Sequence, residues 1–187
     1  KKFHHISQGT RTIPLPYNWL INLEQPKKSP YRLFGFTEEK FVDNDHLLKF
    51  GFIRSKKDAV YNPDGLPIGF AKTPSQNVTG LNRQIDAVGF TCAGCHTSHF
   101  ISDDGSGAKE YIVEGGPATT DLGLFGKSLA AAIGQTVLSS HIPVFDGRFE
   151  RFARSVLGDT YSPQAKLTLK KDLTVFATKN ARESDII

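Results

Sequence analysis

Both cysteines of this 187-residue chain fall in one short stretch, Cys92-Ala93-Gly94-Cys95-His96. Two thiols separated by two residues can form a disulfide, act as a redox dithiol, bind zinc or attach a haem, and each use requires a different surrounding fold. The histidine directly after the second cysteine helps to distinguish these uses. What this stretch binds therefore decides most of what the chain can do.

A zinc site and a redox dithiol both fit the sequence poorly. Structural zinc needs four ligands, usually from two pairs of cysteines or histidines at matched spacing. After His96 the chain offers only His99 and His141, and His99 is too close to the cysteines to form an independent second half. A thioredoxin-like dithiol should lie in a βαβ pattern, which the flanking sequence does not show. A cysteine pair without any function remains a further alternative.

Haem attachment explains the complete motif. Two thiols at this spacing can add to the two vinyl groups along one edge of a porphyrin, and the following imidazole then becomes the proximal iron ligand. Ala93 and Gly94 are small spacers that leave the macrocycle edge unobstructed. The sequence therefore predicts one covalently attached haem c, held by Cys92 and Cys95, with His96 bound to the iron.

The sixth iron ligand is harder to predict. The chain has no methionine, so the thioether ligand common in small electron-transfer cytochromes is excluded. His99 follows His96 too closely to reach the opposite face of the haem. His141, expected at a helix end, is a candidate distal ligand, although a solvent-exposed role is the more usual one. The remaining histidines, expected in arms or on an exposed helix, are His4, His5 and His46.

The pattern of apolar residues and helix signals predicts a mainly α, cytochrome c-like haem domain with long irregular loops and room for one small β-hairpin after the motif. Tyr17 and Trp19 should pack an extended, proline-rich entry onto the body. The segment KTPSQNVTGLNRQID (72–86) is expected to be a polar loop. The expected helices are one capped by Thr37 and ended by Gly51, 124–140, 147–157 capped by Asp146, and one opened by Ser162-Pro163 with Leu169, Leu173, Phe176 and Ala177 buried.

We expect three parts along the chain: an N-terminal arm and packing segment (1–60), the haem domain (61–158) and a C-terminal helix (159–187) that continues into a second domain or partner. The section carrying the cysteines is net acidic between basic ends, which argues against a nucleic-acid-binding groove. No run approaches the roughly 18 apolar residues of a transmembrane helix. We expect a periplasmic or extracellular protein, in which both thiols are used by the haem.

Four stretches in order resemble one family: HHISQGTRTIPLPYNWLINLEQP (4–26), NPDGLPIGFA (62–71), VGFTCAGCHTSHF (88–100) and YIVEGGPATTDLGLF (111–125). They are similar to the N-terminal part of di-haem c-type cytochromes related to bacterial cytochrome c peroxidases, above all the branch that includes the di-haem rubber oxygenases. The similarity extends over about residues 3–158.

The resemblance implies a redox enzyme acting on peroxide or O2 at the haem of Cys92, Cys95 and His96, with electrons supplied by a second haem or a redox partner cytochrome. The chain lacks a second Cys-x-x-Cys-His. We therefore expect a fragment of a di-haem protein, with a mono-haem subunit of a larger assembly as the alternative. The function predicted in second place is electron transport by a six-coordinate haem, and a third is a module whose haem chiefly holds the fold together.

Overall fold

A computed structural model describes residues 2–7, 15–27, 39–103, 105–142 and 147–184. Three short helices lie in the N-terminal third, α1 (Lys2–His5), α2 (Tyr17–Asn22) and α3 (Asn44–Leu48). Strands β1 (Phe70–Asn77) and β2 (Gln84–Phe90) lead to the one-turn helix α4 (Cys92–Cys95), and β3 (Thr97–Asp103) and β4 (Ala108–Glu114) follow it. The chain then forms α5 (Leu122–His141), α6 (Arg148–Leu157), a short 3-10 helix (Gly158–Thr160) and α7 (Pro163–Ser184).

The prediction of a mainly α, cytochrome c-like fold is wrong, because the structure is mixed α/β. The described residues form two antiparallel two-stranded sheets, β1–β2 and β3–β4, one on either side of the cysteine motif. The segment 72–86, expected to be a loop, instead supplies most of the first sheet. The strand tolerates Pro74, because this residue lies where the register shifts between Thr73 and Gln76 and proline is compatible with such an irregularity.

The helices of the C-terminal half agree better with the sequence pattern. Helix α5 begins two residues before the expected 124 and ends one residue after the expected 140, and Leu129 and Ile133 are buried as its spacing predicted. The start of α7 is also confirmed, because the Ser162 hydroxyl accepts a hydrogen bond from the Ala165 amide at 3.1 Å. The buried stripe of α7 consists of Leu169, Leu173 and Phe176, with Ala177 partly buried beside it.

Two predicted caps fall outside the described residues, namely Thr37 and Asp146. The helix expected after Thr37 is shorter than predicted, because α3 begins at Asn44 behind Asp43, whose carboxylate accepts a hydrogen bond from the Asp45 amide at 2.9 Å. Gly51, the expected stop, adopts a positive φ of 81° three residues after the helix ends.

One hydrophobic core joins all three expected parts of the chain. Trp19 of α2, only 2% exposed, contacts Phe152 of α6 and Phe176 of α7 edge-on. Tyr17 is also buried, as predicted, although both residues lie in a helix rather than in an extended entry. A second aromatic group consists of Phe41, Phe50, Phe52, Phe70, Phe90 and Phe125. The many phenylalanines therefore fill the core between the β1–β2 sheet and α5.

The buried Arg148 of α6 fixes this core to the N-terminal third. It is 1% exposed and donates hydrogen bonds to the backbone carbonyls of Glu24, at 3.0 Å, and Gln25. The Glu24 carboxylate in turn accepts two hydrogen bonds from Arg151, at 2.7 and 2.9 Å. A buried guanidinium is stable only with such partners, so these contacts specify how α6 lies against the segment after α2.

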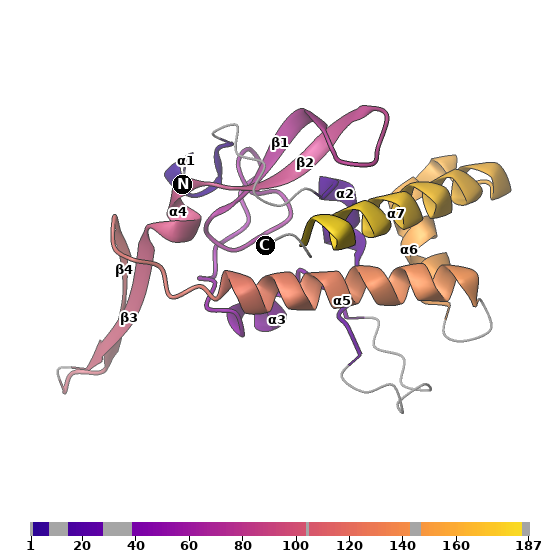
Figure 1. Ribbon diagram of the computed structural model, residues 1–187. Coiled ribbons are helices and arrows are strands. Elements are labelled where there is room, and N and C mark those ends of the chain that lie inside the picture. Colours follow the sequence, from indigo (N-terminus) through magenta and orange to yellow (C-terminus); the bar gives the residue numbers. More distant parts are fainter. Residues whose placement is uncertain (1, 8–14, 28–38, 104, 143–146, 185–187) are drawn as a thin grey trace.

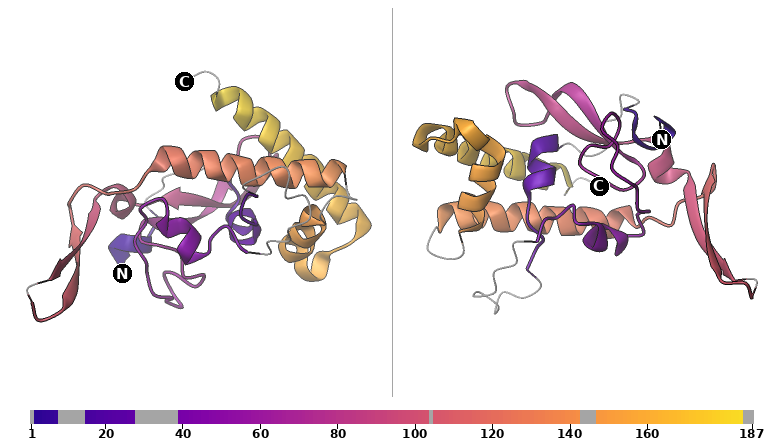
Figure 2. Two further views of the ribbon diagram at one scale, coloured as in Figure 1. Left: turned by 90° about the horizontal axis from the view of Figure 1, so that it is seen from below. Right: turned by 180° about the vertical axis from the view of Figure 1, so that it is seen from behind.

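The β3–β4 hairpin stands apart from this body. Figures 1 and 2 show it extending from α4 beyond one end of the molecule, while α6 and α7 lie at the opposite end. All seven residues of β4 are exposed. The cysteine motif therefore lies where the packed body gives way to a projecting ribbon.

Candidate haem-attachment site

The cysteine motif forms a single helical turn that presents both thiols to solvent. The Gly94 amide donates to the Thr91 carbonyl at 3.0 Å, and the His96 amide donates to the Cys92 carbonyl at 2.8 Å. Residues three apart on a helix share a side, so Cys92 and Cys95 lie together. Neither forms a disulfide, both are exposed, and His96 is exposed directly after them.

The spacers between the cysteines face the protein rather than the solvent. Ala93 is 2% exposed, and Gly94 is buried against Gly69. Gly69 has a φ of +98°, and a Cβ added to it would lie 2.3 Å from the Gly94 Cα. This contact explains why small residues stand between the two cysteines, which the sequence alone did not show. They let the turn pack tightly, so that the thiols remain on the outside.

Backbone hydrogen bonds fix the turn on both sides. Before it, the Thr91 amide donates to the Gly69 carbonyl at 2.8 Å. After it, the Gly115 amide donates to the His96 carbonyl at 2.7 Å, and the Ala118 amide donates to the Cys95 carbonyl at 3.1 Å. Because these bonds join α4 to β1 and to the residues after β4, the two thiols and the imidazole have a defined position relative to the hairpin.

Helix α1 also packs against α4, which the sequence gave no sign of. The His4 carbonyl accepts hydrogen bonds from the Gly69 amide, at 3.0 Å, and from the Thr91 hydroxyl, at 3.3 Å. Its imidazole Nε2 lies 2.9 Å from the Glu114 carboxylate. His4, expected in an arm, is therefore the histidine that the structure brings next to the motif.

The other histidines are placed elsewhere. His5 and His46 are buried, contrary to the expectation, and His5 bonds to the Phe70 carbonyl and the Ser55 hydroxyl. Burial lowers the pKa of His5 below its usual value, and this effect outweighs its hydrogen bond to Phe70. His99 lies on β3, 2.7 Å from the Glu110 carboxylate.

His141, the predicted distal candidate, is not brought together with the motif. It is exposed at the C-terminal end of α5, where its ring nitrogen lies 2.9 Å from the Val137 carbonyl. A helix of 20 residues is about 30 Å long, and the N-terminal end of α5 is the end that follows the hairpin. In Figure 1 the C-terminal end of α5 lies on the side of α6 and α7.

Exposed apolar side chains are concentrated in α1, in the β3–β4 hairpin and at the start of α5, the segments that flank or pack against the cysteine turn. Of thirteen exposed large hydrophobic residues in the described part of the chain, nine belong to α1 and the residue after it, the β3–β4 hairpin or the start of α5. They are Phe3, Ile6, Phe100, Ile101, Tyr111, Ile112, Val113, Leu122 and Leu124. Since water is a poor solvent for such side chains, a cluster of them marks a surface that binds an apolar group.

The donors at this site are two thiols and one imidazole. Within the described residues, no group of three or more histidine, cysteine, aspartate or glutamate side chains could hold a metal ion. Thr97, next to His96, has a buried hydroxyl without a hydrogen-bond partner in the described structure. Two exposed thiols, one exposed imidazole and surrounding apolar surface are what a haem attached through its vinyl groups requires.

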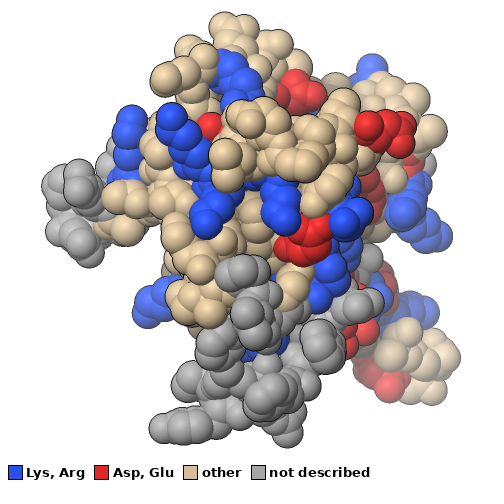
Figure 3. All heavy atoms as spheres, turned by 90° about the vertical axis from the view of Figure 1, so that its right-hand side faces the viewer, with Lys and Arg blue, Asp and Glu red and all other residues tan. Residues whose placement is uncertain are grey.

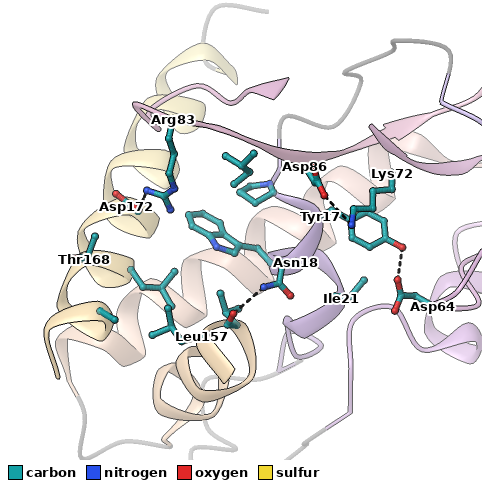
Figure 4. Close-up of a pocket in the computed structure, with 16 residues that line it drawn as sticks. Tyr17, Asn18, Ile21, Asp64, Lys72, Arg83, Asp86, Leu157, Thr168 and Asp172 are labelled. Carbon is teal, nitrogen blue, oxygen red and sulfur yellow. Dashed lines mark hydrogen bonds and ion pairs between the residues drawn. The ribbon is translucent and has the colours of Figure 1, made fainter. Parts of the chain in front are cut away.

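A separate cavity of about 680 Å³ lies away from the motif, between α2, the β1–β2 sheet, α6 and α7 (Figure 4). Its polar side chains already pair with one another. Tyr17 donates to Asp64 at 2.7 Å, and Lys72 lies 2.9 Å from Asp86. Burial, with the bond to Asp64, raises the pKa of Tyr17 well above its usual value. Arg83 and Asp172 form a third pair at 2.7 Å. None of the three motif residues lines this cavity.

The surface at the end of the molecule farthest from the β3–β4 hairpin carries many basic side chains. Figure 3 shows lysine and arginine side chains spread over that end, which carries α6 and α7. Several of them are paired, for example Lys166 with Glu150 and Arg83 with Asp172. No helix within the described residues is long and apolar enough to cross a membrane.

Comparisons with known proteins give one similarity. The chain is 38% identical over 180 residues to a protein of Sinorhizobium fredii (strain NBRC 101917 / NGR234) described as "Uncharacterized protein y4iJ". The alignment covers 91% of this chain and 26% of the relative, so the chain spans about a quarter of the length of the curated protein it matches. No family model and no solved structure matches the chain.

Proposed function

We propose that this chain binds one haem c through Cys92 and Cys95, with His96 as an iron ligand, and that it acts in redox chemistry. The observation that carries the proposal is the turn of α4, whose two thiols and following imidazole are exposed, and whose flanking segments carry exposed apolar side chains. When bound, haem c supplies one-electron transfer and, at an open iron position, binding of O2 or peroxide.

Each residue of the turn has a separate task in this proposal. The Cys92 and Cys95 thiols each add across one vinyl double bond, so that a C–S bond forms and the thiol hydrogen passes to the other vinyl carbon. Because this addition is redox-neutral, it needs no oxidant. The backbone bonds of His96 to Cys92 and Gly115 hold its backbone next to the two cysteines, where its imidazole would serve as the iron ligand.

The wider role is proposed from the resemblance of the four sequence stretches. It favours the reactive-haem part of a di-haem peroxidase or oxygenase in the periplasm or outside the cell, supplied with electrons by a second haem domain or a redox partner cytochrome. Electron transfer by a six-coordinate haem is the competing role. His141, the candidate distal ligand of the sequence analysis, lies at the distant end of α5, so its position does not favour the six-coordinate role.

The haem content of purified variants tests the attachment. The protein is produced in a periplasm that contains the c-type maturation machinery, and non-covalent haem is removed by acid–acetone extraction before the pyridine haemochrome is measured. The unmodified protein should retain haem, whereas Cys92→Ala with Cys95→Ala should lose it. Retention of haem by the double variant would overturn the proposal.

The role of His96 is tested against its neighbour. His96→Ala should change the absorption spectrum of the attached haem, because the iron loses a strong nitrogen ligand. His99→Ala is the matched control, since His99 lies three residues away and its imidazole is 2.7 Å from the Glu110 carboxylate, and it should leave the spectrum unchanged. Addition of CO or cyanide to the unmodified protein separates the two roles: rapid binding supports the enzyme, and an unresponsive spectrum supports electron transfer.

A further inference from the structure

The β3–β4 hairpin has two chemically different faces. Strand residues alternate between faces, and the register pairs Ser98 with Val113 and Phe100 with Tyr111. Phe100, Tyr111 and Val113 therefore share one side of the ribbon, which we call the aromatic face. The opposite side, the charged face, carries His99, Ile101, Glu110, Ile112 and Glu114.

The aromatic face carries an uncovered apolar patch, with Ser102 and Lys109 beyond it towards the tip of the hairpin. Phe100 is 49% exposed, and Tyr111 and Val113 are each 43% exposed. The two rings lie 5.2 Å apart and nearly parallel, at 15°, so they form one continuous surface. A two-stranded ribbon is marginally stable in water, and leaving this surface hydrated forgoes the stabilisation that burial would give. The aromatic face therefore suits a flat apolar partner.

The charged face suits such a partner less well. Its His99 and Glu110 side chains pair at 2.7 Å, and Glu114 pairs with His4 of α1 at 2.9 Å. An apolar group laid on this side would remove water from both pairs, which costs free energy unless every charge stays satisfied. The two faces thus differ in the kind of surface that they can cover.

The hairpin begins at the attachment point, which limits what can reach the aromatic face. The Gly115 amide bonds to the His96 carbonyl, so β3 leaves and β4 returns next to the iron ligand. Ser98, opposite Val113, is about 7 Å along the strand from His96, and Phe100 is about 13 Å away, at a rise of about 3.3 Å per residue. A porphyrin joined to Cys92 and Cys95 is a flat apolar group within this range.

We propose that the aromatic face of the β3–β4 hairpin packs against the porphyrin held by Cys92 and Cys95 and shields it from water. The proposal rests on the haem attachment proposed above. Phe100, Tyr111 and Val113 then form part of the cofactor pocket, in which they exclude solvent and raise the reduction potential, because a dry environment disfavours the additional charge of the ferric form.

Variants on the two faces of the hairpin test this assignment. Phe100→Ser with Tyr111→Ser removes the aromatic face, whereas Ile101→Ser with Ile112→Ser is a matched control on the charged face. Circular dichroism in the Soret band reports aromatic rings close to the haem, and a spectroelectrochemical titration gives its reduction potential. The aromatic-face variant should keep its haem, lose most of the Soret dichroism and have a lower potential. The control should keep both properties.

A third variant distinguishes lost contact from lost folding. Phe100→Leu with Tyr111→Leu keeps an apolar surface, so it should retain the potential while it loses the dichroism of the rings. Wild-type dichroism and potential in the serine aromatic-face variant, with haem retained, would overturn the proposal, and so would equal changes in the control. Failure of the attachment itself is recognised separately, because the unmodified protein would then carry no haem.

Discussion

The imidazole of His4 in α1 lies 2.9 Å from the carboxylate of Glu114 in β4, so a residue near the N-terminus contacts the root of the projecting hairpin. The backbone carbonyl of His4 accepts hydrogen bonds from the Gly69 amide and from the hydroxyl of Thr91, the residue directly before the cysteine turn. His4 thus connects β1, α4 and the hairpin, and it fixes how the hairpin leaves the site.

Weakening this connection should loosen the hairpin without unfolding the body. We expect Glu114→Gln to lower the free energy of unfolding by less than about 1 kcal/mol, because the glutamate is 57% exposed and water screens the pair. Hydrogen exchange of the β3 and β4 amides should become faster. Glu110→Gln is the control for loss of a carboxylate from the same strand. If the exchange at the hairpin root changed equally in both variants, the special role of His4 would be refuted.

Gly69 and Gly94 should respond very differently to the same substitution. Gly69→Ala should cost about 2–4 kcal/mol of unfolding free energy, because its Cβ would overlap the Gly94 backbone at a positive φ. Gly94→Ala is the matched control, since its Cβ would meet Gly69 at 3.4 Å, an ordinary contact distance. Urea denaturation measures both. Similar losses would show that the cysteine turn does not pack as described.

We expect the protein to lose stability in alkali because the hydroxyl of Tyr17 is buried. Its pKa lies above the usual value of 10.0 in the folded protein, so the folded state keeps a proton that the unfolded state releases. The resulting stabilisation is complete below pH 10 and should decrease as the pH rises above it. Tyr17→Phe should remove this part of the decrease. Parallel stability curves for the two proteins between pH 9 and 11 would contradict the assignment.

We expect the protein to lose stability in acid because of Glu150 in α6. Its hydrogen bond from Lys166, together with one from Tyr161, lowers its pKa from 4.5 to about 2. The depressed pKa stabilises the fold above pH 4.5, and this contribution should vanish as the pH falls towards 2. Because Glu150 is about one-third exposed, the effect should be below about 1 kcal/mol. Glu150→Gln should have a flatter acid limb in thermal denaturation, and an unchanged limb would argue against the pairing with α7.

The helices could be predicted because their apolar residues repeat along one face. Leu129 and Ile133 of α5, and Leu169 and Leu173 of α7, are buried as this spacing requires. The first sheet could not be predicted. The second half of β1 is polar and contains Pro74, and its pairing with β2 depends on backbone hydrogen bonds that the side-chain pattern does not reveal.

The residues of the candidate site could be identified from the sequence, but their surroundings could not. Cys92, Cys95 and His96 are adjacent in the sequence, so their grouping follows from the chain itself. The approach of His4 and the contact of Gly69 with Gly94 depend on tertiary packing between distant segments. The spacing of residues within a motif carries no information about such contacts.

The intact mass of the denatured protein tests covalent haem attachment most directly. After production with the c-type maturation machinery, the unmodified chain should exceed its sequence mass by one haem. Each single variant, Cys92→Ala or Cys95→Ala, should leave a single thioether that is less resistant to removal, and the double variant should show the bare chain mass. A bare chain mass for the unmodified protein, or a haem adduct on the double variant, would contradict the account.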